Sequence, residues 1–301
     1  MPEYGQLFIL LSPRGRRSLR RLTPGQDIHG ADGVIPAARL AETGFGSEVR
    51  TLQGAPFRIL RPTLYDLVRG VKRLTQVLYP KDIGYICVRL GVGNGTRIIE
   101  AGSGSGSLTL ALSWLSGERG HVYTYECRQE FYDLCGRNLA WAGVGGNVTR
   151  HLRDIGEGFL QRDADALFLD VRTPWDYLGQ ATAALRRGAP LACLLPTVEQ
   201  VSRLLEALET SSFDDIEVEE ILVRGWKPVA GRLRPQDRMV AHTGFLVFAR
   251  VQERSAEFEA LKPLGTRDRK RQKALRDRLV GTREYGDPRN SGGEPADSVL
   301  P

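Results

Sequence analysis

The fold is decided by one stretch, Arg97-Ile98-Ile99-Glu100-Ala101-Gly102-Ser103-Gly104-Ser105-Gly106-Ser107-Leu108-Thr109. A short apolar run ends in an acid, three glycines alternate with small residues, and a helical pattern begins at Ser107. Glycine lets the backbone turn sharply and approach a ligand closely. A helix that begins directly afterwards offers free N–H groups and a positive dipole end. The stretch therefore predicts a strand, a ligand-binding loop and a helix at the edge of an open α/β sheet.

The spacing of these glycines separates two classes of cofactor. A dinucleotide-binding loop follows the pattern GxGxxG, and its third glycine would fall at Ser107 or Thr109, so neither register fits. A nicotinamide dehydrogenase is therefore disfavoured. The pattern acid-x-Gly-x-Gly-x-Gly instead resembles motif I of the class I S-adenosylmethionine-dependent methyltransferases. A tight strand–helix turn without a ligand is the simplest alternative.

The alternation of strand and helix patterns extends over residues 82–250. The predicted strands are Arg97–Glu100, His121–Tyr125, Val148–Leu152, Ala166–Asp170, Pro190–Leu195, Asp215–Val223 and Gly244–Val251. The predicted helices are Ser107–Leu115, Gln129–Ala142, Trp175–Leu185 and Val198–Thr210. This alternation predicts an α/β fold with a doubly wound, mostly parallel sheet. The last two strands have no helical pattern between them, so we expect an antiparallel connection at one edge.

The remainder of the chain divides by composition into two further regions. Short apolar pieces separated by glycine and proline predict a small β-rich N-terminal domain over residues 1–60. A helix and a turn are expected over residues 63–80, at the start of the α/β domain of residues 61–251. Residues 262–279 could form a charged helix within a basic, partly disordered tail of residues 252–301.

Basic residues are clustered in the sequence of 301 residues. Lysine and arginine exceed the acids by 42 − 36 = 6 charges, residues 14–21 hold five arginines and no acid, and residues 262–278 hold eight basic residues. Such clusters suit a polyanion, because each phosphate contact releases condensed counterions. Solvated faces or tails are the alternative explanation.

The cysteine pattern and the hydropathy exclude several classes of protein. No CxxC pair occurs among Cys87, Cys127, Cys135 and Cys193, so no zinc site, other metal site or disulfide framework is expected. No run reaches about 18 apolar residues, which excludes a membrane-spanning helix. The sequence predicts a reduced, cytoplasmic protein.

Acidic residues stand at the carboxyl ends of four successive predicted strands. They are Glu100, Glu126, Asp154 and Asp170. Glu126 suits two ribose hydroxyls, which are hydrogen-bond donors, and Asp154 could accept from an adenine amino group. Each acid alone is more often a cap or a solvated side chain. Together they favour one nucleoside-containing ligand along the sheet edge, and a carboxylate would also attract a sulfonium cation.

Several further motifs resemble one family, the tRNA adenine-N1 methyltransferases that modify adenine 58 in the T-loop. The matching pieces, in chain order, are Arg61-Pro62-Thr63, Thr75-Gln76-Val77-Leu78-Tyr79-Pro80-Lys81-Asp82, the glycine stretch, Tyr125-Glu126, Leu169-Asp170 with Pro174-Trp175, Leu195-Pro196-Thr197 with Gln200, and His242-Thr243-Gly244-Phe245-Leu246. The resemblance covers about residues 58–250. Two features have no counterpart in the family pattern, namely the basic segments at both ends and Arg172, where a neutral or acidic residue is expected.

The resemblance implies a Rossmann-like methyltransferase sheet of seven strands, a small N-terminal domain that helps to hold tRNA, S-adenosylmethionine as cofactor, and a homotetramer. It also implies the site residues. The cofactor residues would be Gln76, Glu100, Gly102, Ser103, Gly104, Ser105, Gly106, Ser107, Leu108, Glu126, Arg128, Asp154 and Asp170. The substrate residues would be Tyr79, His242, Thr243, Arg16 and Arg17, with Asp170 and Tyr79 at the reaction centre.

Methyl transfer to adenine N1 creates a cation. A carboxylate that accepts from the adenine N6 amino group would stabilise this charge in a dry pocket, and Asp170 is the residue type and place for it. Tyr79 offers an aromatic wall for a flipped base, although a core aromatic is the alternative. His242 could contact phosphate or ribose, although a structural histidine is more common. The sequence after Asp170 lacks the Pro-Pro pair of N6-amino methyltransferases, which favours a ring nitrogen as acceptor.

Two other functions compete with this hypothesis. A class I methyltransferase for protein, other RNA or a small molecule would explain the glycine loop and the acids, but not the arginine clusters. A non-catalytic tRNA-binding subunit would lack the glycine loop and the acid of the fourth strand, and both are present here.

Overall fold

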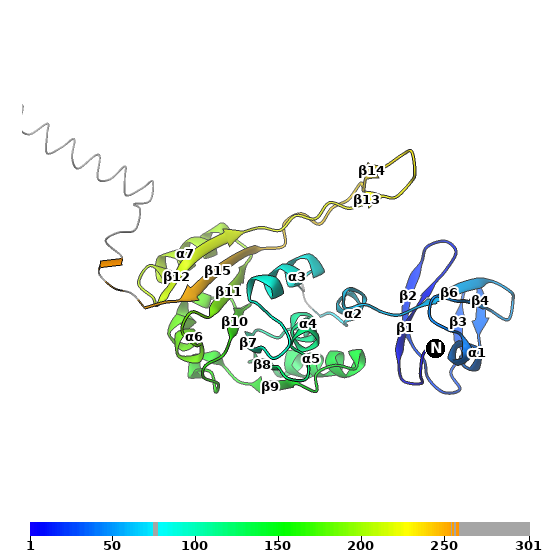
Figure 1. Ribbon diagram of the computed structural model, residues 1–301, viewed down its shortest axis with the longest axis horizontal. Coiled ribbons are helices and arrows are strands. Elements are labelled where there is room, and N and C mark those ends of the chain that lie inside the picture. The colour runs from blue at the N-terminus through cyan, green and yellow to red at the C-terminus, as the bar shows by residue number, and fades with distance from the viewer. Residues whose placement is uncertain (75–77, 254, 256, 259–301) are drawn as a thin grey trace, which may run out of the picture. The chain divides into compact units, whose positions relative to one another are not determined.

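The computed structural model describes residues 1–74, 78–253, 255, 257 and 258. The chain divides into two compact units, Met1–Glu253 and Arg254–Pro301. The elements below belong to the first unit (Figure 1). The helix predicted over residues 262–279 lies outside the described residues.

A seven-stranded sheet with the strand order β12-β15-β11-β10-β7-β8-β9 forms the centre of this unit. Its strands are β7 (Arg97–Ala101), β8 (His121–Glu126), β9 (Val148–Leu152), β10 (Ala166–Leu169), β11 (Pro190–Leu195), β12 (Phe213–Glu219) and β15 (Phe245–Val251). Strands β11, β10, β7, β8 and β9 pair in parallel, whereas β15 pairs antiparallel with both β11 and β12. The predicted doubly wound, mostly parallel sheet with an antiparallel edge is therefore confirmed.

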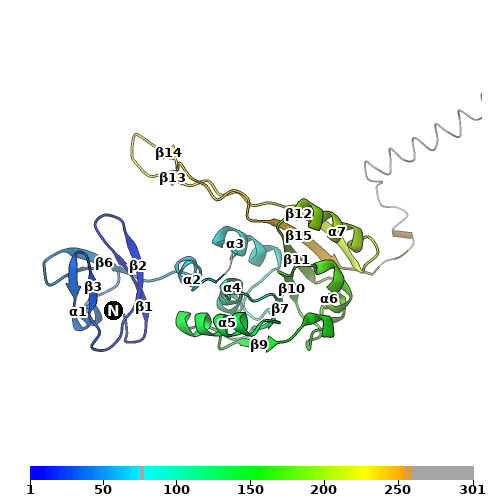
Figure 2. The same ribbon diagram turned by 180° about the vertical axis from the view of Figure 1, so that it is seen from behind.

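Helices cover both faces of this sheet. Successive strand residues point to opposite faces, and both sets of side chains are apolar and buried here. On one face, Ile98 and Phe168 pack against helices α2, α3, α4 and α5, and on the other, Ile99 and Leu167 pack against α6 and α7 (Figure 1, and from behind Figure 2). The helices are α2 (Leu64–Gly70), α3 (Pro80–Arg89), α4 (Ser107–Ser116), α5 (Gln129–Ala142), α6 (Leu178–Ala184) and α7 (Val198–Leu208), with short 3₁₀ turns η1 (Ile155–Glu157) and η2 (Pro174–Tyr177).

Helix α3 differs from the sequence expectation. The helix expected within residues 63–80 ends at Gly70, and a second helix begins at Pro80. Thr63 and Asp66 form a capping box at the start of α2, and proline occupies the first turn of α3, where its missing N–H costs nothing. Three buried residues of α3, Ile83, Ile86 and Cys87, then pack on the sheet. Proline thus marks the beginning of a helix here and not the end of one.

A small antiparallel module precedes α2, as the sequence predicts. Its sheet has the order β2-β1-β6-β5, with β1 (Leu7–Leu11), β2 (Arg17–Arg21), β5 (Glu48–Arg50) and β6 (Pro56–Leu60), beside the hairpin β3 (Ile28–Gly30) and β4 (Gly33–Ile35) and the helix α1 (Ala37–Glu42). Phe8, Leu40 and Ile59 belong to its own buried core. The arginine-rich strand β2 and helix α1 were not expected from the sequence. The domain boundaries at residues 60 and 251 stay predictions.

One side of β2 contacts the α/β part of the unit. The Arg17 Nη2 atom lies 3.0 Å from Asp66 Oδ1 of α2, and Arg21 donates to the Trp141 carbonyl oxygen. The end of α2 is packed so closely that a Cβ on Gly70 would lie 2.8 Å from Leu19. These contacts fix β2 against α2 and the end of α5.

No helix among the described residues has both the length and the apolar character needed to cross a bilayer.

Glu100 is a buried acid in the middle of this packing. Only 1% of its surface is exposed, and Thr109 Oγ1 of α4 and Thr124 Oγ1 of β8 each donate to its Oε2 atom at 2.6 Å. Burial raises the pKa of the Glu100 carboxyl to about 7, although the two hydroxyl groups oppose this shift. Folding therefore takes up a proton between the ordinary carboxyl pKa and about pH 7.

Replacing Glu100 by glutamine should remove this proton uptake. Stability that depends on a protonated Glu100 is complete at low pH and is lost as the pH rises through about 7. We expect the free energy of unfolding of Glu100→Gln, relative to wild type, to increase between pH 5 and pH 8. Urea unfolding at several pH values measures it. A difference that stays constant with pH would show that the folded protein does not raise this pKa.

Candidate active site

The glycine loop after β7 touches the end of β10 through backbone atoms. Gly102 has a φ of +91°, and a Cβ at this position would lie 2.1 Å from the carbonyl oxygen of Asp170. The Asp170 amide also donates to the Ala101 carbonyl oxygen at 2.9 Å. Gly106 has a φ of +78°, and its Cβ would lie 2.8 Å from Cys135 Sγ of α5. The first and last of the three glycines therefore allow contacts that a side chain would prevent.

A pocket of about 330 Å³ opens where the loop meets the carboxyl ends of β7, β8, β9 and β10. These four strands are neighbours in the order β10-β7-β8-β9, so three acids of the predicted row, Glu126, Asp154 and Asp170, lie around one pocket. Its lining includes Gly102, Glu126, Arg128, Asp154, Asp170 and Arg172. Glu100 does not line this pocket, because its carboxylate lies underneath the loop with Thr109 and Thr124.

Glu126 holds the loop and the wall of the pocket together. Its Oε2 atom accepts from the Gly104 amide at 3.2 Å, and its Oε1 atom accepts from the amide of Arg128 at 3.1 Å. The Arg128 side chain also donates to Oε1 and covers the ring of Phe131 at 3.9 Å. A nearly buried carboxylate fixed in this way can accept from ligand hydroxyl groups without reorganising.

Asp154 and Asp170 complete the polar lining. Asp154 is exposed and caps η1, with its Oδ1 atom accepting from the Gly156 amide at 2.8 Å. Asp170 has an exposed face toward the pocket. The protein packed around its inner side and the nearby Glu126 carboxylate raise the pKa of Asp170 to about 6, against the opposing effect of the Arg128 guanidinium. A carboxylate with this pKa is ionised at neutral pH and remains reachable by a ligand.

The other predicted loop residues are mostly enclosed. Ser103, Ser105, Ser107 and Leu108 are buried. Ser105 is fixed through its carbonyl oxygen, which accepts from Asn138 Nδ2 of α5 at 2.7 Å. The loop is therefore held rigidly by its surroundings. Gln76, also predicted for the cofactor, lies outside the described residues.

Two predicted substrate residues lie at the same sheet edge, beyond β10. His242 and Thr243 are separated by Gly244 from β15, whose first residue Phe245 pairs with Leu195 at the end of β11. The His242 ring nitrogens lie 2.7 Å from Glu220 Oε1 and 3.2 Å from the Pro196 carbonyl oxygen. The hydrogen bond with Glu220 is the main cause that raises the pKa of His242.

Thr243 contacts a motif that lies far away in the sequence. Its Oγ1 atom donates to Asp82 Oδ2 at 2.9 Å and accepts from Lys81 Nζ at 2.5 Å. Lys81 and Asp82 follow Tyr79, which is half-buried at the N-cap of α3 and does not line the pocket. Lys81 and Asp82 belong to the motif Tyr79-Pro80-Lys81-Asp82, and the sequence alone indicates no role for them. Their position two and three residues after Tyr79 was the available signal.

The two predicted arginines of the N-terminal module lie apart from the pocket and differ from each other. Arg17 is paired with Asp66. Arg16 lines a separate hollow of about 200 Å³ together with Arg20 and His29. Only Arg16 therefore remains open to a ligand in the way that the sequence suggested for both.

Comparison with known proteins adds independent information. Residues 58–232 match the family model described as tRNA methyltransferase complex GCD14 subunit. The tRNA (adenine(57)-N(1)/adenine(58)-N(1))-methyltransferase TrmI of Methanocaldococcus jannaschii is 32% identical over 270 residues, which cover 81% of this chain and 94% of that protein. The tRNA (adenine(58)-N(1))-methyltransferase TrmI of Thermus thermophilus is 35% identical over 247 residues, with 81% and 96% covered.

Solved structures agree with this result. A protein described as a SAM-dependent O-methyltransferase from Thermotoga maritima has a TM-score of 0.79 and 41% identity, and the match covers 84% of this chain and 95% of that one. The tRNA (m1A58) methyltransferase TrmI from Aquifex aeolicus has a TM-score of 0.73 and 36% identity, with 84% and 99% covered.

Proposed function

The chain belongs to the family of the tRNA methyltransferase complex GCD14 subunit, and from this premise we propose that it transfers a methyl group from S-adenosylmethionine to N1 of adenine 58 in the T-loop of tRNA. The observation that carries the proposal is the Asp170 carboxylate, which lines the same pocket as the glycine loop. The described homologues from Methanocaldococcus, Thermus and Aquifex support the choice of base.

The pocket residues fit S-adenosylmethionine. Glu126 offers acceptors for two ribose hydroxyl groups, and Asp154 can accept from the adenine amino group. The carboxylates also attract a sulfonium cation. When bound, S-adenosylmethionine supplies an electrophilic methyl carbon.

Asp170 has two tasks in this mechanism. Its exposed carboxylate accepts a hydrogen bond from the N6 amino group of the target adenine and so orients N1 toward the methyl donor. It then stabilises the positive charge that develops on the purine as N1 is methylated. No general base is needed, because N1 carries its own lone pair. We propose that Tyr79 provides the aromatic surface for the target base and that His242 contacts a phosphate or ribose of the tRNA.

Mass spectrometry of nucleosides from treated tRNA tests this function. Unmodified tRNA incubated with the protein and S-adenosylmethionine should gain 1-methyladenosine at position 58, and tRNA with guanosine at that position should not. Asp170→Asn should keep cofactor binding, measured by calorimetry, and lose turnover by about 100-fold or more.

The pH dependence supplies a further readout of the same variant. Since the pKa of Asp170 is raised to about 6, the active carboxylate is lost as the pH falls through this value, and wild-type kcat/KM should fall with it. The residual activity of Asp170→Asn should lack this acidic limb. Normal turnover in the variant would remove Asp170 from the mechanism, and methyl groups on another nucleoside, on oxygen or on protein would favour a different class I methyltransferase.

We propose that the arginines of β2 and the preceding Arg16 differ in their contribution to tRNA binding. Side chains alternate along a strand, so Arg17 and Arg21 point to the side that contacts α2 and α5. Arg16 and Arg20 belong to the other side and line the hollow that also contains His29. We assign the phosphate contacts to this second pair.

Replacing Arg16 and Arg20 together by alanine should weaken tRNA binding at low salt. Each lost phosphate contact lowers the slope of log K against log salt by about one, so the double variant should lose about two in slope. Filter binding across a salt series measures it. Arg50→Ala, in the same module but paired with Glu48, is the matched control and should leave the slope unchanged. Equal slopes in all three proteins would contradict this assignment.

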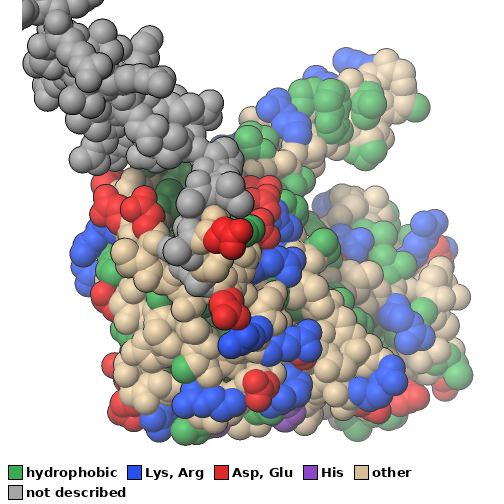
Figure 3. Space-filling model, turned by 60° about the vertical axis from the view of Figure 1, so that its left-hand side comes forward, with side chains coloured by type: hydrophobic (Ala, Val, Ile, Leu, Met, Phe, Trp, Pro, Cys, Tyr) green, Lys and Arg blue, Asp and Glu red, His purple; other side chains and the backbone are tan. Residues whose placement is uncertain are grey.

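Self-assembly into a homotetramer, in the cytoplasm, completes the proposal. Residues 220–244 form a hairpin, here named the arm, that projects from the sheet and contains the short strands β13 (Trp226–Lys227) and β14 (Arg234–Pro235) (Figure 1). Apolar side chains are exposed along it beside basic ones (Figure 3), and exposed apolar surface of this kind is typical of protein contacts. The four free cysteines agree with a reducing compartment.

Light scattering coupled to gel filtration tests the assembly. Wild-type protein should have four times the monomer mass of 33.4 kDa. Trp226→Glu, which places a charge on the arm at a residue that is 51% exposed, should give smaller species. A monomeric wild-type protein would contradict the homotetramer. Assembly only after addition of a second polypeptide would favour the kind of complex named in the family description.

A further inference from the structure

A buried ion pair joins the start of α3 to the base of the arm. Lys81 Nζ lies 2.8 Å from Asp82 Oδ1, 2.7 Å from the Ile221 carbonyl oxygen and 2.5 Å from Thr243 Oγ1. The Thr243 hydroxyl then donates to Asp82 Oδ2 at 2.9 Å. Only 9% of the Lys81 side chain and 2% of the Asp82 side chain are exposed. We name Lys81, Asp82 and Thr243 the clamp.

The clamp connects three segments that are distant in the sequence. Lys81 and Asp82 lie in the first turn of α3, Ile221 lies on one stem of the arm, and Thr243 lies on the other stem, separated by Gly244 from β15. The carbonyl oxygen of Tyr79 accepts from the amides of Asp82 and Ile83, both at 3.0 Å. Whatever fixes Lys81 and Asp82 therefore also fixes Tyr79.

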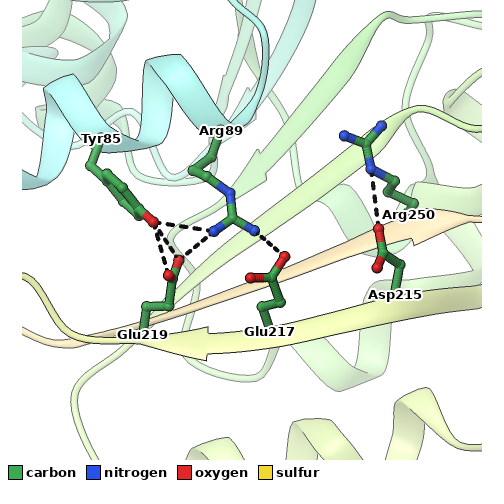
Figure 4. A network of polar contacts seen from close by, with 6 residues as sticks. All are labelled: Tyr85, Arg89, Asp215, Glu217, Glu219 and Arg250. Carbon is green, nitrogen blue, oxygen red and sulfur yellow. Dashed lines mark hydrogen bonds and ion pairs between the residues drawn. The ribbon is translucent and has the colours of Figure 1, made fainter.

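A second set of contacts holds the same helix farther from Tyr79. Tyr85 and Arg89 point from α3 toward Glu219 and Glu217 of β12 (Figure 4). Tyr85 Oη lies 2.8 Å from Glu219 Oε2, and Arg89 Nη2 lies 2.6 Å from Glu217 Oε1. These side chains are only partly buried. Helix α3 is thus anchored twice, and the clamp is the anchor beside Tyr79.

Stability alone does not account for a buried charge pair. Removing two charges from water costs about as much as their attraction returns, so apolar residues of similar volume would serve as well or better. Charged hydrogen bonds are directional and apolar contacts are not, because each donor must meet its acceptor at a set distance and angle. The clamp therefore fixes the orientation of the α3 N-terminus against the sheet edge.

We propose that Lys81, Asp82 and Thr243 are positioning residues for methyl transfer. They hold Tyr79 at the carboxyl edge that also carries Asp170, at the place where the adenine enters. The inference rests on the proposed function for its kinetic consequence. It assigns Thr243 to the support of Tyr79 instead of to direct contact with tRNA, since its hydroxyl already donates to Asp82 and accepts from Lys81.

A pair of matched substitutions tests the clamp. Thr243→Val and Tyr85→Phe each remove one hydroxyl group from an anchor of α3 and leave every charge in place. We expect Thr243→Val to lower kcat/KM for tRNA by about 10-fold or more, since small misplacements of reacting groups are costly. The Kd for S-adenosylmethionine should stay unchanged. Tyr85→Phe should retain wild-type kinetics, and Thr243→Ser should restore them.

Hydrogen exchange gives a readout that does not depend on activity. Thr243→Val should speed exchange of the Asp82 and Ile83 amides, whereas Tyr85→Phe should not. Wild-type kinetics in Thr243→Val, or an equal loss in both variants, would overturn the positioning role. A kinetic loss without faster exchange would also overturn it and would favour direct contact of Thr243 with tRNA. If the wild-type protein methylates no tRNA, the proposed function fails, and hydrogen exchange still decides whether the clamp orders the start of α3.

Discussion

The whole site depends on one close approach between two backbone segments. The Gly102 backbone passes the Asp170 carbonyl oxygen so closely that a Cβ would lie 2.1 Å from it, and the Asp170 amide bonds to the Ala101 carbonyl oxygen next to it. This contact places the glycine loop and the Asp170 carboxylate in the same pocket. Gly102 has no side chain, and for that reason it allows the glycine loop to lie beside the Asp170 carboxylate.

The parallel sheet places residues that follow successive strands side by side at one edge. The carboxyl ends of β9, β8, β7 and β10 carry Asp154, Glu126, Gly102 and Asp170, and the next two strands, β11 and β15, add Pro196 and His242 at the same edge. The first four positions line the pocket proposed for the nucleoside cofactor, and the last two lie beyond it at the same edge. Asp170 lies between these two groups, which agrees with the proposed role of its carboxylate beside the methyl donor.

Electrostatics divides the charged residues into those that hold the structure and those left for a ligand. Arg17 is used in an ion pair with Asp66 and Lys81 in the clamp, whereas Arg16 and Asp170 keep an open face. Residues of one type in neighbouring positions thus differ in function, because strand alternation and burial decide which partners they reach. The same separation explains why a basic cluster in a sequence is a poor guide to the individual residues that contact phosphate.

Local sequence patterns were enough to predict the seven strands of the central sheet, the glycine loop and the order of the acids, because glycine spacing and apolar periodicity act over a few residues. The packed structure was needed to show that Glu100 lies beneath the loop and that Lys81 meets Thr243. Those features depend on contacts between segments up to about 160 positions apart. No local pattern encodes such a contact, since it arises only when the sheet brings the two ends together.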